Sequence, residues 1–318
     1  MNRGAKSIAV GSGLKQENAF ASVSVIIPTK NRSEDLVRTI KTLLLQTYPV
    51  SQLVIVDQSP DTLSHDGVVE VLQEAKESPT LQYVRDTTIS GGAVARNRAM
   101  CLADGDIWLF LDDDVDLEAD FVEQIIQTYN EHPEAIGVSG VVTNYTRPAV
   151  FFRMWNRLFC TGPFWDERQP IYWAINRGRG TKPVRVRKFG AGLMSFKAEA
   201  IAHQRFDDRL RGTSDGEDVD FCQHLGRQAV LLITPRARLV HNQSPQGRSR
   251  EHWLPRHART AWYLYLRNWR GGFVNRFAFL WLNAGYIVTA AAVAAKKRSF
   301  NPFIEYRGAI RDAMKLVD

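Results

Sequence analysis

Cysteine is scarce in this chain, which has three in 318 residues. Cys101, Cys160 and Cys222 are odd in number and far apart, a pattern that excludes a disulfide framework and favours a reducing compartment. No pair has the spacing of zinc ligands, so we expect no structural zinc site. The polar stretch before Asn18 also lacks the apolar core of a secretory signal. We expect residues 1–21 to be a disordered lead-in.

Acidic residues are scarce in the second half of the chain. Up to Tyr145 there are 11 Lys and Arg against 21 Asp and Glu, whereas 30 against 13 follow from Thr146 onward. A basic half can face nucleic acid, an anionic membrane or a phosphorylated small molecule, or it can be a generic solubilising surface. Here Arg dominates and is mixed with Trp and Phe, which favours a binding surface. The length suits one large domain with an accessory segment, or two modest domains.

Strand and helix patterns alternate through the first 145 residues. Apolar β-branched runs are typical of buried strands, and apolar residues three or four apart indicate helices. We therefore expect an α/β fold, with a mostly parallel sheet and helices on both faces. The expected strands are Val23 to Ile27, Leu53 to Val56, Leu81 to Val84, Ile107 to Leu111 and Ala135 to Val142. The first expected helix has Ser33 as a plausible N-cap. The next expected helices cover residues 66–75, 91–103 and 118–129.

Polar clusters follow three of these strands. They begin at Thr29 after the first strand, at Asp57 after the second and at Asp112 after the fourth. Ligands of parallel α/β sheets bind at the carboxyl ends of the strands. The pattern therefore predicts that the three clusters line one crevice.

The second half is less regular. Thr146 to Lys188 reads as an insertion rich in Arg, Trp and Phe, and Val184 to Phe196 has room for two short strands. Asp218 to Leu225 suits a short helix and Ala229 to Ile233 a last strand, and the pattern is helical again from Pro255. The second half thus adds strands to the sheet and ends in helices.

The sequence Asp112-Asp113-Asp114 places three carboxylates directly after an apolar strand. Holding them ionised together is costly unless a cation lies among them. Hard oxygen ligands suit Mg²⁺ or Mn²⁺, which bind through one or two carboxylates plus substrate phosphates. A solvated acidic turn is the alternative, but the position on the crevice edge favours a metal site.

Four other positions have two interpretations each. Asp57 can cap a turn or accept a hydrogen bond from a nucleotide, and the glycine pair at Gly91 can be a plain turn or open a phosphate-binding helix. Asp218 can cap a helix or take a proton from an acceptor hydroxyl. His241 can be structural or a ligand of a metal or phosphate.

Seven stretches, in order across residues 22–244, resemble glycosyltransferase family 2, whose members have the GT-A-type nucleotide-sugar fold. The resemblance implies a Rossmann-like nucleotide-binding half and inversion at the transferred sugar. One departure is Gln58-Ser59-Pro60 after Asp57, where the family has Asp or Asn followed by Gly-Ser, and it leaves the base preference open. The stretches are Val23 to Arg32, Ile55 to Asp57, Gly91 to Arg98, Phe110 to Val115, Phe189 to Lys197, Phe206 to Asp208 and Gly216 to Phe221.

The resemblance implies roles on the donor side. The nucleotide-sugar would contact a set of residues from the first three polar stretches and the acid triplet. A divalent cation, Mg²⁺ or Mn²⁺, would be held by Asp112 and Asp114, together with His241. The expected nucleotide-sugar-binding residues are Pro28, Thr29, Asn31, Asp57, Arg96, Asp112 and Asp113.

It also implies roles on the acceptor side. Asp218 would be the catalytic base, and a UDP- or dTDP-type donor would transfer its sugar to a glycan or lipid-linked acceptor in cell-surface polysaccharide or lipid-linked glycan synthesis. The acceptor would lie against Gly190, Gly192, Met194 and Glu217. We expect a catalytic domain over residues 22–244, with a nucleotide-sugar half (22–145) and an acceptor half (146–244).

The remaining segment, 245–318, is expected to be helical and membrane-associated. Phe277 to Ala295 is uncharged and long enough to approach the thickness of a bilayer core, although a helix buried against the catalytic domain is the alternative. Aromatic and basic residues nearby suit a headgroup interface. We expect peripheral contact with the inner face of the cytoplasmic membrane, from the cytoplasmic side.

Two other functions compete with this interpretation. A sugar-nucleotide nucleotidyltransferase would have a similar sheet, but it would need a glycine-rich loop after the first strand, where Pro28 to Arg32 has no glycine. A nucleic-acid-binding protein would use the basic half, but it would leave the acid triplet unexplained. Nucleic acid is therefore not an expected partner.

Overall fold

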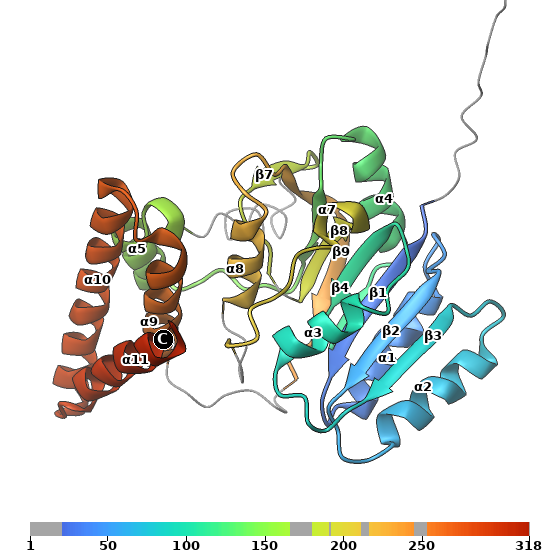
Figure 1. The fold of residues 1–318 in the computed structure, drawn as a ribbon, viewed down its shortest axis with the longest axis horizontal. Coiled ribbons are helices and arrows are strands. Elements are labelled where there is room, and N and C mark those ends of the chain that lie inside the picture. The colour runs from blue at the N-terminus through green and yellow to red at the C-terminus, as the bar shows by residue number, and fades with distance from the viewer. Residues whose placement is uncertain (1–20, 166–179, 191, 211–215, 245–252, 318) are drawn as a thin grey trace, which may run out of the picture.

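The computed structural model describes residues 21–165, 180–190, 192–210, 216–244 and 253–317. The disordered lead-in expected for residues 1–21 lies outside these ranges apart from Ala21. A single nine-stranded sheet forms the centre, with helices on both of its faces (Figure 1). The structure confirms the expected α/β class and the helical end of the chain.

The strands of the sheet run in the order β3-β2-β1-β4-β8-β6-β9-β5, and β7 pairs with β9. Neighbours from β3 to β4 are parallel, whereas β8 is antiparallel to both β4 and β6. The first half of the chain therefore supplies the parallel part. The strands are β1 Val23–Thr29, β2 Gln52–Asp57, β3 Thr80–Arg85, β4 Ile107–Leu111, β5 Val115–Leu117, β6 Gly137–Val142, β7 Val184–Val186, β8 Leu193–Lys197 and β9 Leu231–His241.

The register of the parallel strands aligns their carboxyl ends. Thr29 pairs with Asp57 across β1 and β2, and Ile26 pairs with Phe110 across β1 and β4. These strands are buried on both faces, which is why their sequences are nearly continuous apolar runs rather than alternating ones. The polar clusters after β1, β2 and β4 consequently lie on one edge, as the sequence predicts.

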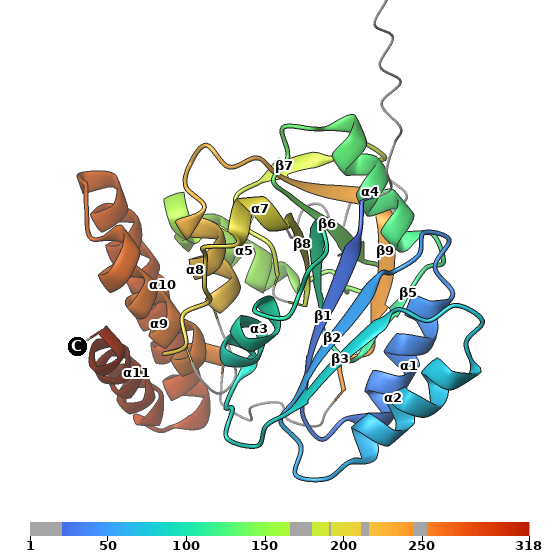
Figure 2. The same ribbon diagram turned by 45° about the vertical axis from the view of Figure 1, so that its right-hand side comes forward.

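Helices cover the two faces in separate layers (Figure 2). On one face, α1 (Ser33–Leu44), α2 (Leu63–Glu74) and α4 (Phe121–Glu131) bury Leu36, Val68 and Ile125 in a common core. On the other face, α3 (Gly92–Met100), α7 (Ala198–Ile201) and α8 (Glu217–His224) pack on the sheet, and Phe221 stacks on Phe206. Each layer buries one apolar stripe of each helix.

The last helices of the chain form a bundle together with the earlier helix α5, beside the sheet and at the left of Figure 1. They have their own core around Trp155, Leu282 and Tyr286. Helix α10 is the one helix in the described part of the chain long and apolar enough to cross a membrane, with a mean hydropathy of 1.7. The bundle consists of α5 Val150–Phe159, α9 Trp253–Leu264, the π-helical turn Tyr265–Trp269, α10 Phe273–Lys297 and α11 Asn301–Val317, and a short 3₁₀ helix, Gly162–Phe164, follows α5.

The differences from the sequence-based expectations include α1, β9 and α5. Helix α1 begins at Ser33, but Arg32 occupies the cap position and makes no side-chain cap bond. Strand β9 continues beyond Ile233 to His241, because a register shift against β6 between Ser139 and Val141 absorbs the residues around its proline. Helix α5 was not among the expected elements, although its polar residues Arg153, Asn156 and Arg157 recur at helical spacing and so share one side of the helix.

Candidate active site at the edge of the sheet

The acid triplet forms the turn between β4 and β5. Its carboxylates point in different directions, because the chain turns tightly after Leu111. Asp112 is partly exposed, whereas Asp113 and Asp114 are buried. The triplet therefore provides two environments rather than one acidic patch.

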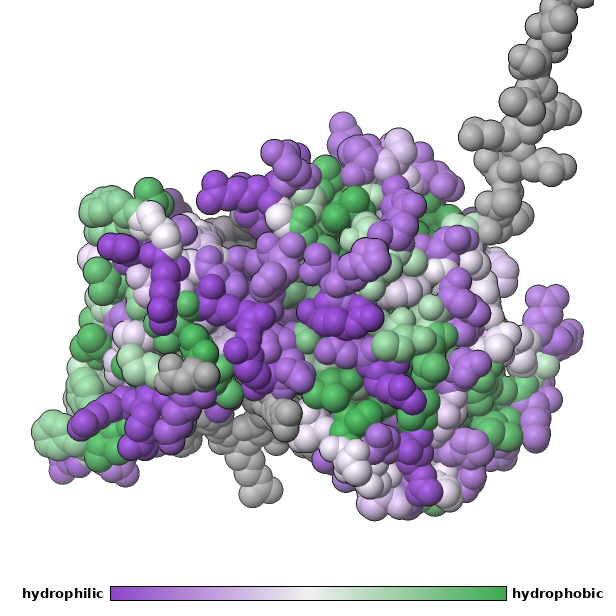
Figure 3. Space-filling view, viewed as in Figure 1, coloured by the Kyte–Doolittle hydropathy of each residue, from purple (hydrophilic) through white to green (hydrophobic). Residues whose placement is uncertain are grey.

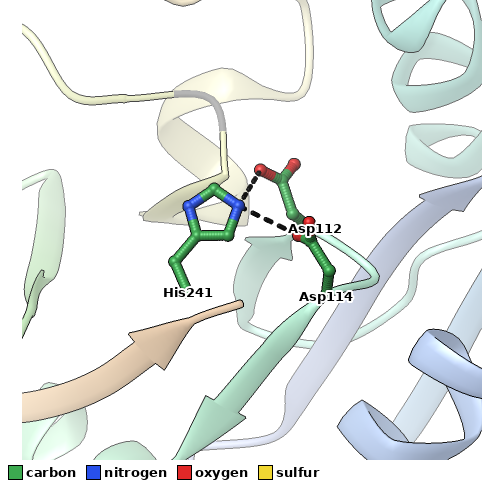
Figure 4. Close-up of side chains that lie close together, drawn as sticks. All are labelled: Asp112, Asp114 and His241. Carbon is green, nitrogen blue, oxygen red and sulfur yellow. Dashed lines mark ion pairs between the residues drawn. The ribbon is translucent and has the colours of Figure 1, made fainter. Parts of the chain in front are cut away.

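Asp112 and Asp114 both face the same ring nitrogen of His241 (Figure 4). The Nε2 atom of His241 lies 3.0 Å from Oδ1 of Asp114 and 3.9 Å from Oδ2 of Asp112. One candidate ligand atom from each of the three side chains lies within 4.8 Å of the others. The antiparallel pairing of Val115 with His241 at the end of β9 brings these distant residues together.

The surroundings hold Asp114 and His241 in place. Oδ2 of Asp114 accepts a 2.8 Å hydrogen bond from the backbone N–H of Ser244. Burial opposes ionisation, but the His241 imidazole and the Ser244 N–H outweigh it and lower the pKa of Asp114 below its ordinary value. Asn144 exchanges hydrogen bonds with both backbone groups of His241. Asp114 is therefore ionised and fixed at neutral pH.

Asp113 points into the protein. One of its oxygens accepts from Oγ1 of Thr29 at 2.7 Å and the other from the guanidinium of Arg32 at 2.8 Å. Burial raises the pKa of Asp113 to about 6, against the opposing effect of Arg32. The Asp113 side chain thus ties the end of β1 to the acid turn, and its contact with the donor stays a prediction.

Arg96 joins the acid turn to helix α8. The guanidinium is buried, and it donates to Oε1 of Glu217 at 3.1 Å and to Oδ1 of Asp112 at 3.3 Å. Burial and the charge of Asp218 raise the pKa of Glu217 well above its ordinary value, and Arg96 acts in the opposite direction. Arg96 thus links a residue of the predicted donor side with one of the predicted acceptor side.

The loops after β1 and β2 form the next part of the edge. Asn31 adopts a positive φ of 55° and its N–H donates to Oγ of Ser59 at 2.7 Å. Asp57 is fully buried, with one oxygen accepting from the N–H of Ser59 and the other from the hydroxyl of Tyr83 at 2.6 Å. Pro28 and Thr29 lie next to this loop on β1. The predicted nucleotide-binding residues therefore lie on one edge, although Asp57 has its carboxylate engaged within the protein.

Asp218 lies in the first turn of helix α8 and lines a cavity of about 300 Å³. The cavity walls come from α5, α8, α9 and α10 and carry several aromatic rings. Gly216, with a φ of +94°, precedes Asp218 and packs against Thr260 so closely that a Cβ would collide with its methyl group. Next to Asp218 the cavity is lined by Phe152, Trp155, Lys188, Trp253, His257 and Tyr286.

The predicted acceptor residues separate into two groups. Gly190 and Gly192 flank the start of β8, and a Cβ on Gly192 would collide with the carboxylate of Asp112. Met194, in contrast, is fully buried in the core opposite Phe110. The prediction for Met194 is therefore not supported, because the alternation along β8 turns its side chain away from the acid turn.

The donor set at the acid turn suits a divalent cation. Two carboxylates and an imidazole offer hard oxygens and one nitrogen at mutual distances that one ion can bridge. Gly192 keeps the space beside Asp112 free of a side chain. Asp112, Asp114 and His241 are accordingly the described residues that could hold the metal.

Arg32 and Ser244 were not among the predicted site residues. Arg32 lies 2.8 Å from Asp113 and 3.7 Å from Asp114, so it balances the negative charge of the turn. Its position beside Asn31 could have identified Arg32 as a site residue, because the sequence already places that loop on the edge of the crevice. Ser244 acts through its backbone N–H, which no residue type reveals.

Comparison with known proteins supports a single family. The family described as Glycosyl transferase family 2 matches residues 24–199. The glucosyl-dolichyl phosphate glucuronosyltransferase of Haloferax volcanii is 26% identical over 191 residues, which cover 56% of this chain and 53% of that protein. The amylovoran biosynthesis glycosyltransferase of Erwinia amylovora is 35% identical over 104 residues, covering 32% of this chain and 34% of that protein. The chain therefore spans about half or less of the length of these curated relatives.

Solved structures agree on the fold. A mannosyltransferase of Pyrobaculum calidifontis, solved with GDP-Man and Mn²⁺, has a TM-score of 0.55 at 19% identity and covers 93% of this chain and 85% of its own. Staphylococcus aureus TarS, solved with UDP-GlcNAc, has a TM-score of 0.61 at 14% identity, with 93% of this chain and 82% of its own covered. At these identities the likeness shows the fold alone.

Proposed function

Because the chain belongs to glycosyl transferase family 2, we propose that it transfers a sugar from a nucleotide-sugar donor to an acceptor hydroxyl with inversion. The glycosyltransferase activity itself follows from the family. The observation that carries the finer proposal is the convergence of Asp112, Asp114 and His241 at the edge of the sheet, joined through Arg96 to the helix of Asp218. A UDP- or dTDP-type donor is proposed on the family resemblance.

Asp112, Asp114 and His241 would hold a divalent cation, Mg²⁺ or Mn²⁺, against the diphosphate of the donor. When bound, the ion neutralises charge on the leaving nucleoside diphosphate. The role of Arg32 and Asp113 is to fix the turn that carries these ligands. Among related folds, the Pyrobaculum enzyme was solved with Mn²⁺, which favours testing that ion first.

Asp218 would act as the general base. Its carboxylate takes the proton of the acceptor hydroxyl as the hydroxyl oxygen attacks the anomeric carbon, and the bond to the diphosphate oxygen breaks on the opposite side. The products are the glycosylated acceptor and the nucleoside diphosphate. Buried Glu217 and Arg96 would position the start of α8 relative to the acid turn.

The acceptor is proposed to be a glycan or a lipid-linked glycan, with peripheral contact at the inner face of the cytoplasmic membrane. The relatives support this class, since one acts on a dolichyl phosphate-linked sugar and another serves amylovoran biosynthesis. We also propose that the catalytic domain, residues 22–244, consists of a donor-binding half (22–145) and an acceptor-binding half (146–244).

The first experiment is a screen of UDP-, dTDP- and GDP-sugars for slow hydrolysis without acceptor, with Mn²⁺, with Mg²⁺ and with a chelator. We expect metal-dependent release of one nucleotide, which identifies the donor. Hydrolysis that is unaffected by the chelator, or no release from any donor, would contradict the proposed metal site.

A variant tests the base separately. Asp218→Asn keeps the size of the side chain but cannot accept the proton, so we expect transfer to fall by about 100-fold or more while donor binding is retained. The measurement is product formation together with calorimetric titration of the nucleotide. Near-normal turnover in this variant would refute the role of Asp218.

A further inference from the structure

Helices α5, α10 and the start of α11 expose large apolar side chains on the side away from the sheet. Figure 3 shows hydrophobic residues gathered along this edge of the molecule. We call this set the outer face, and each member is more than half exposed. The outer face consists of Val150, Phe151, Met154 and Leu158 on α5, Phe273, Val274, Phe277 and Leu280 on α10, and Phe300 and Ile304 at the start of α11.

The α5 and α10 parts of the outer face are continuous. The indole N–H of Trp281 donates to the carbonyl of Leu158 at 2.6 Å, and its ring packs on Phe159 with centroids 5.7 Å apart. Both Leu158 and Trp281 are exposed, so apolar surface is present on both sides of the seam between the helices. Contiguous apolar surface of this kind marks an interaction site.

The uncharged part of α10 lies between cations. Phe277 to Ala295 contains no charged residue, whereas Arg276 precedes it and Lys296, Lys297 and Arg298 follow, all exposed. An apolar stripe bracketed by cations fits a bilayer with anionic headgroups. A second copy of the chain fits poorly, because either a parallel or an antiparallel pairing of two α10 helices would bring cations against cations.

The opposite side of α10 is packed on protein. Leu282, Tyr286 and Ala290 are buried against the other bundle helices, and 39% of the most apolar part of α10 is buried. A cation-flanked helix with one face packed on protein and the other apolar and exposed is suited to lie in the headgroup layer.

The same helices line the cavity of Asp218 with their inner sides. Phe152 and Trp155 of α5 and Leu282 and Tyr286 of α10 face this cavity, which Asp218 borders from α8. Aromatic rings favour sugar rings through their apolar faces, as they favour other flat apolar partners. The cavity thus lies between the proposed catalytic base and the helices that carry the outer face.

We propose that the outer face seats on an anionic bilayer, and that the cavity receives the saccharide head group of an acceptor anchored in that bilayer. The first clause names the surface for the peripheral membrane contact proposed above, and the second rests on the proposed transfer reaction. The arrangement brings the acceptor hydroxyl to Asp218 from the membrane side, while the donor binds at the acid turn, which Arg96 links to the neighbouring Glu217.

The test of the surface is flotation with vesicles of phosphatidylglycerol and phosphatidylcholine, compared with phosphatidylcholine alone. We expect the wild-type chain to float with the anionic vesicles, and the double variant Phe277→Glu and Leu280→Glu to lose at least about tenfold in partitioning. The matched control is Leu45→Glu with Leu63→Glu, which changes two equally exposed leucines remote from the bundle. Equal flotation of both variants, or a stable dimer that dissociates in the Phe277→Glu and Leu280→Glu variant, would overturn the proposal.

The head-group clause is tested with dodecyl and methyl glycosides of the same sugars as acceptor probes, the dodecyl forms being embedded in the anionic vesicles. We expect wild-type initial rates to favour the dodecyl form by about tenfold, and the outer-face variant to lose this preference while keeping its rate on the methyl form. Equal wild-type rates on the two forms would overturn this clause. Metal-dependent donor hydrolysis without acceptor is measured in parallel. Absence of this hydrolysis in the wild type contradicts the proposed function. A wild type that hydrolyses the donor but does not float contradicts the proposed membrane-binding role of the outer face.

Discussion

Asp113 and Asp114 are neighbours in the sequence but face different surroundings. Asp113 is held by Thr29 and Arg32 inside the protein, whereas Asp114 faces His241. Single residues in this turn therefore have separable roles, one in holding the turn and the other in binding a cation.

Asp114→Asn removes the charge on the proposed ligand but preserves its size. We expect metal-dependent donor hydrolysis to fall at least on the order of 10–100-fold, because even outer partners of metal ligands contribute that much. Calorimetric titration of Mn²⁺ with the nucleotide should show the same loss. The matched control is Asp116→Asn, which changes an exposed carboxylate paired with Arg38 on the following strand. A similar loss in both variants would argue against a specific ligand.

Gly192→Ala places a methyl group where the carboxylate of Asp112 lies. We expect the carboxylate to be displaced and metal-dependent hydrolysis to fall by about tenfold or more, with little change in the far-ultraviolet circular dichroism spectrum. Gly308→Ala serves as control, because a Cβ at Gly308 meets no atom within 4 Å. Unchanged hydrolysis in Gly192→Ala would show that Asp112 can move without consequence.

His257 predicts a pH dependence of stability. Burial and, to a lesser extent, the charge of Arg256 lower the pKa of His257 from 6.5 to about 4. Between these values the unfolded chain binds a proton that the folded chain excludes, so the free energy of unfolding falls as pH drops from about 6.5 to 4 and loses no more from this group below that, with a total of at most about 3 kcal/mol.

The measurement for His257 is chemical denaturation at pH 7 and pH 4.5 in the wild type and in His257→Gln. We expect a smaller loss on acidification in the variant, which has no imidazole to protonate. Equal losses would mean that His257 takes up its proton in the folded state at an ordinary pKa.

At the scale of elements, the approach of α5 to α10 depends on one glycine. A Cβ on Gly285 would lie 2.5 Å from Cγ of Phe159, and the carbonyl of Gly285 accepts from the indole of Trp155 at 3.2 Å. We expect Gly285→Ala to separate the two helices and lower the free energy of unfolding by about 1–3 kcal/mol, as overpacking does. Thermal unfolding measures this, with Gly308→Ala again as control. A stability equal to wild type would show that the seam can adjust.

Most elements of the first half could be predicted from the sequence, because β1, β2 and β4 are buried apolar runs and α1 and α4 have clear apolar periods. β4 matches its expected bounds, Ile107 to Leu111. β5 and most of β9 could not be predicted, since β5 has three residues and β9 contains Pro235 within a bulge. Helix α5 was missed although its polar and apolar residues separate at helical spacing, because the Arg-, Trp- and Phe-rich stretch around it was interpreted as an insertion.

At the scale of the molecule, the site was predictable only in part. The edge shared by Thr29, Asp57 and Asp112 follows from parallel topology, so motif positions alone were sufficient. The contacts of Asp114 with His241 and of Arg96 with Glu217 depend on how the second half folds back on the first. Met194 was assigned to the wrong side because a loop motif does not specify which face of the following strand a residue takes.

The uneven distribution of charge along the chain gives the folded molecule two electrical poles. The part up to Tyr145, which forms the parallel sheet, is net acidic, and the part that follows, which includes the bundle, is net basic. A body with such a dipole turns in the field of a negatively charged sheet while it is still about a Debye length away, about 8–10 Å in ordinary salt. The field would then orient the molecule before it reaches the surface. Added salt would therefore lower the rate of association with the surface more strongly than it raises the rate of dissociation.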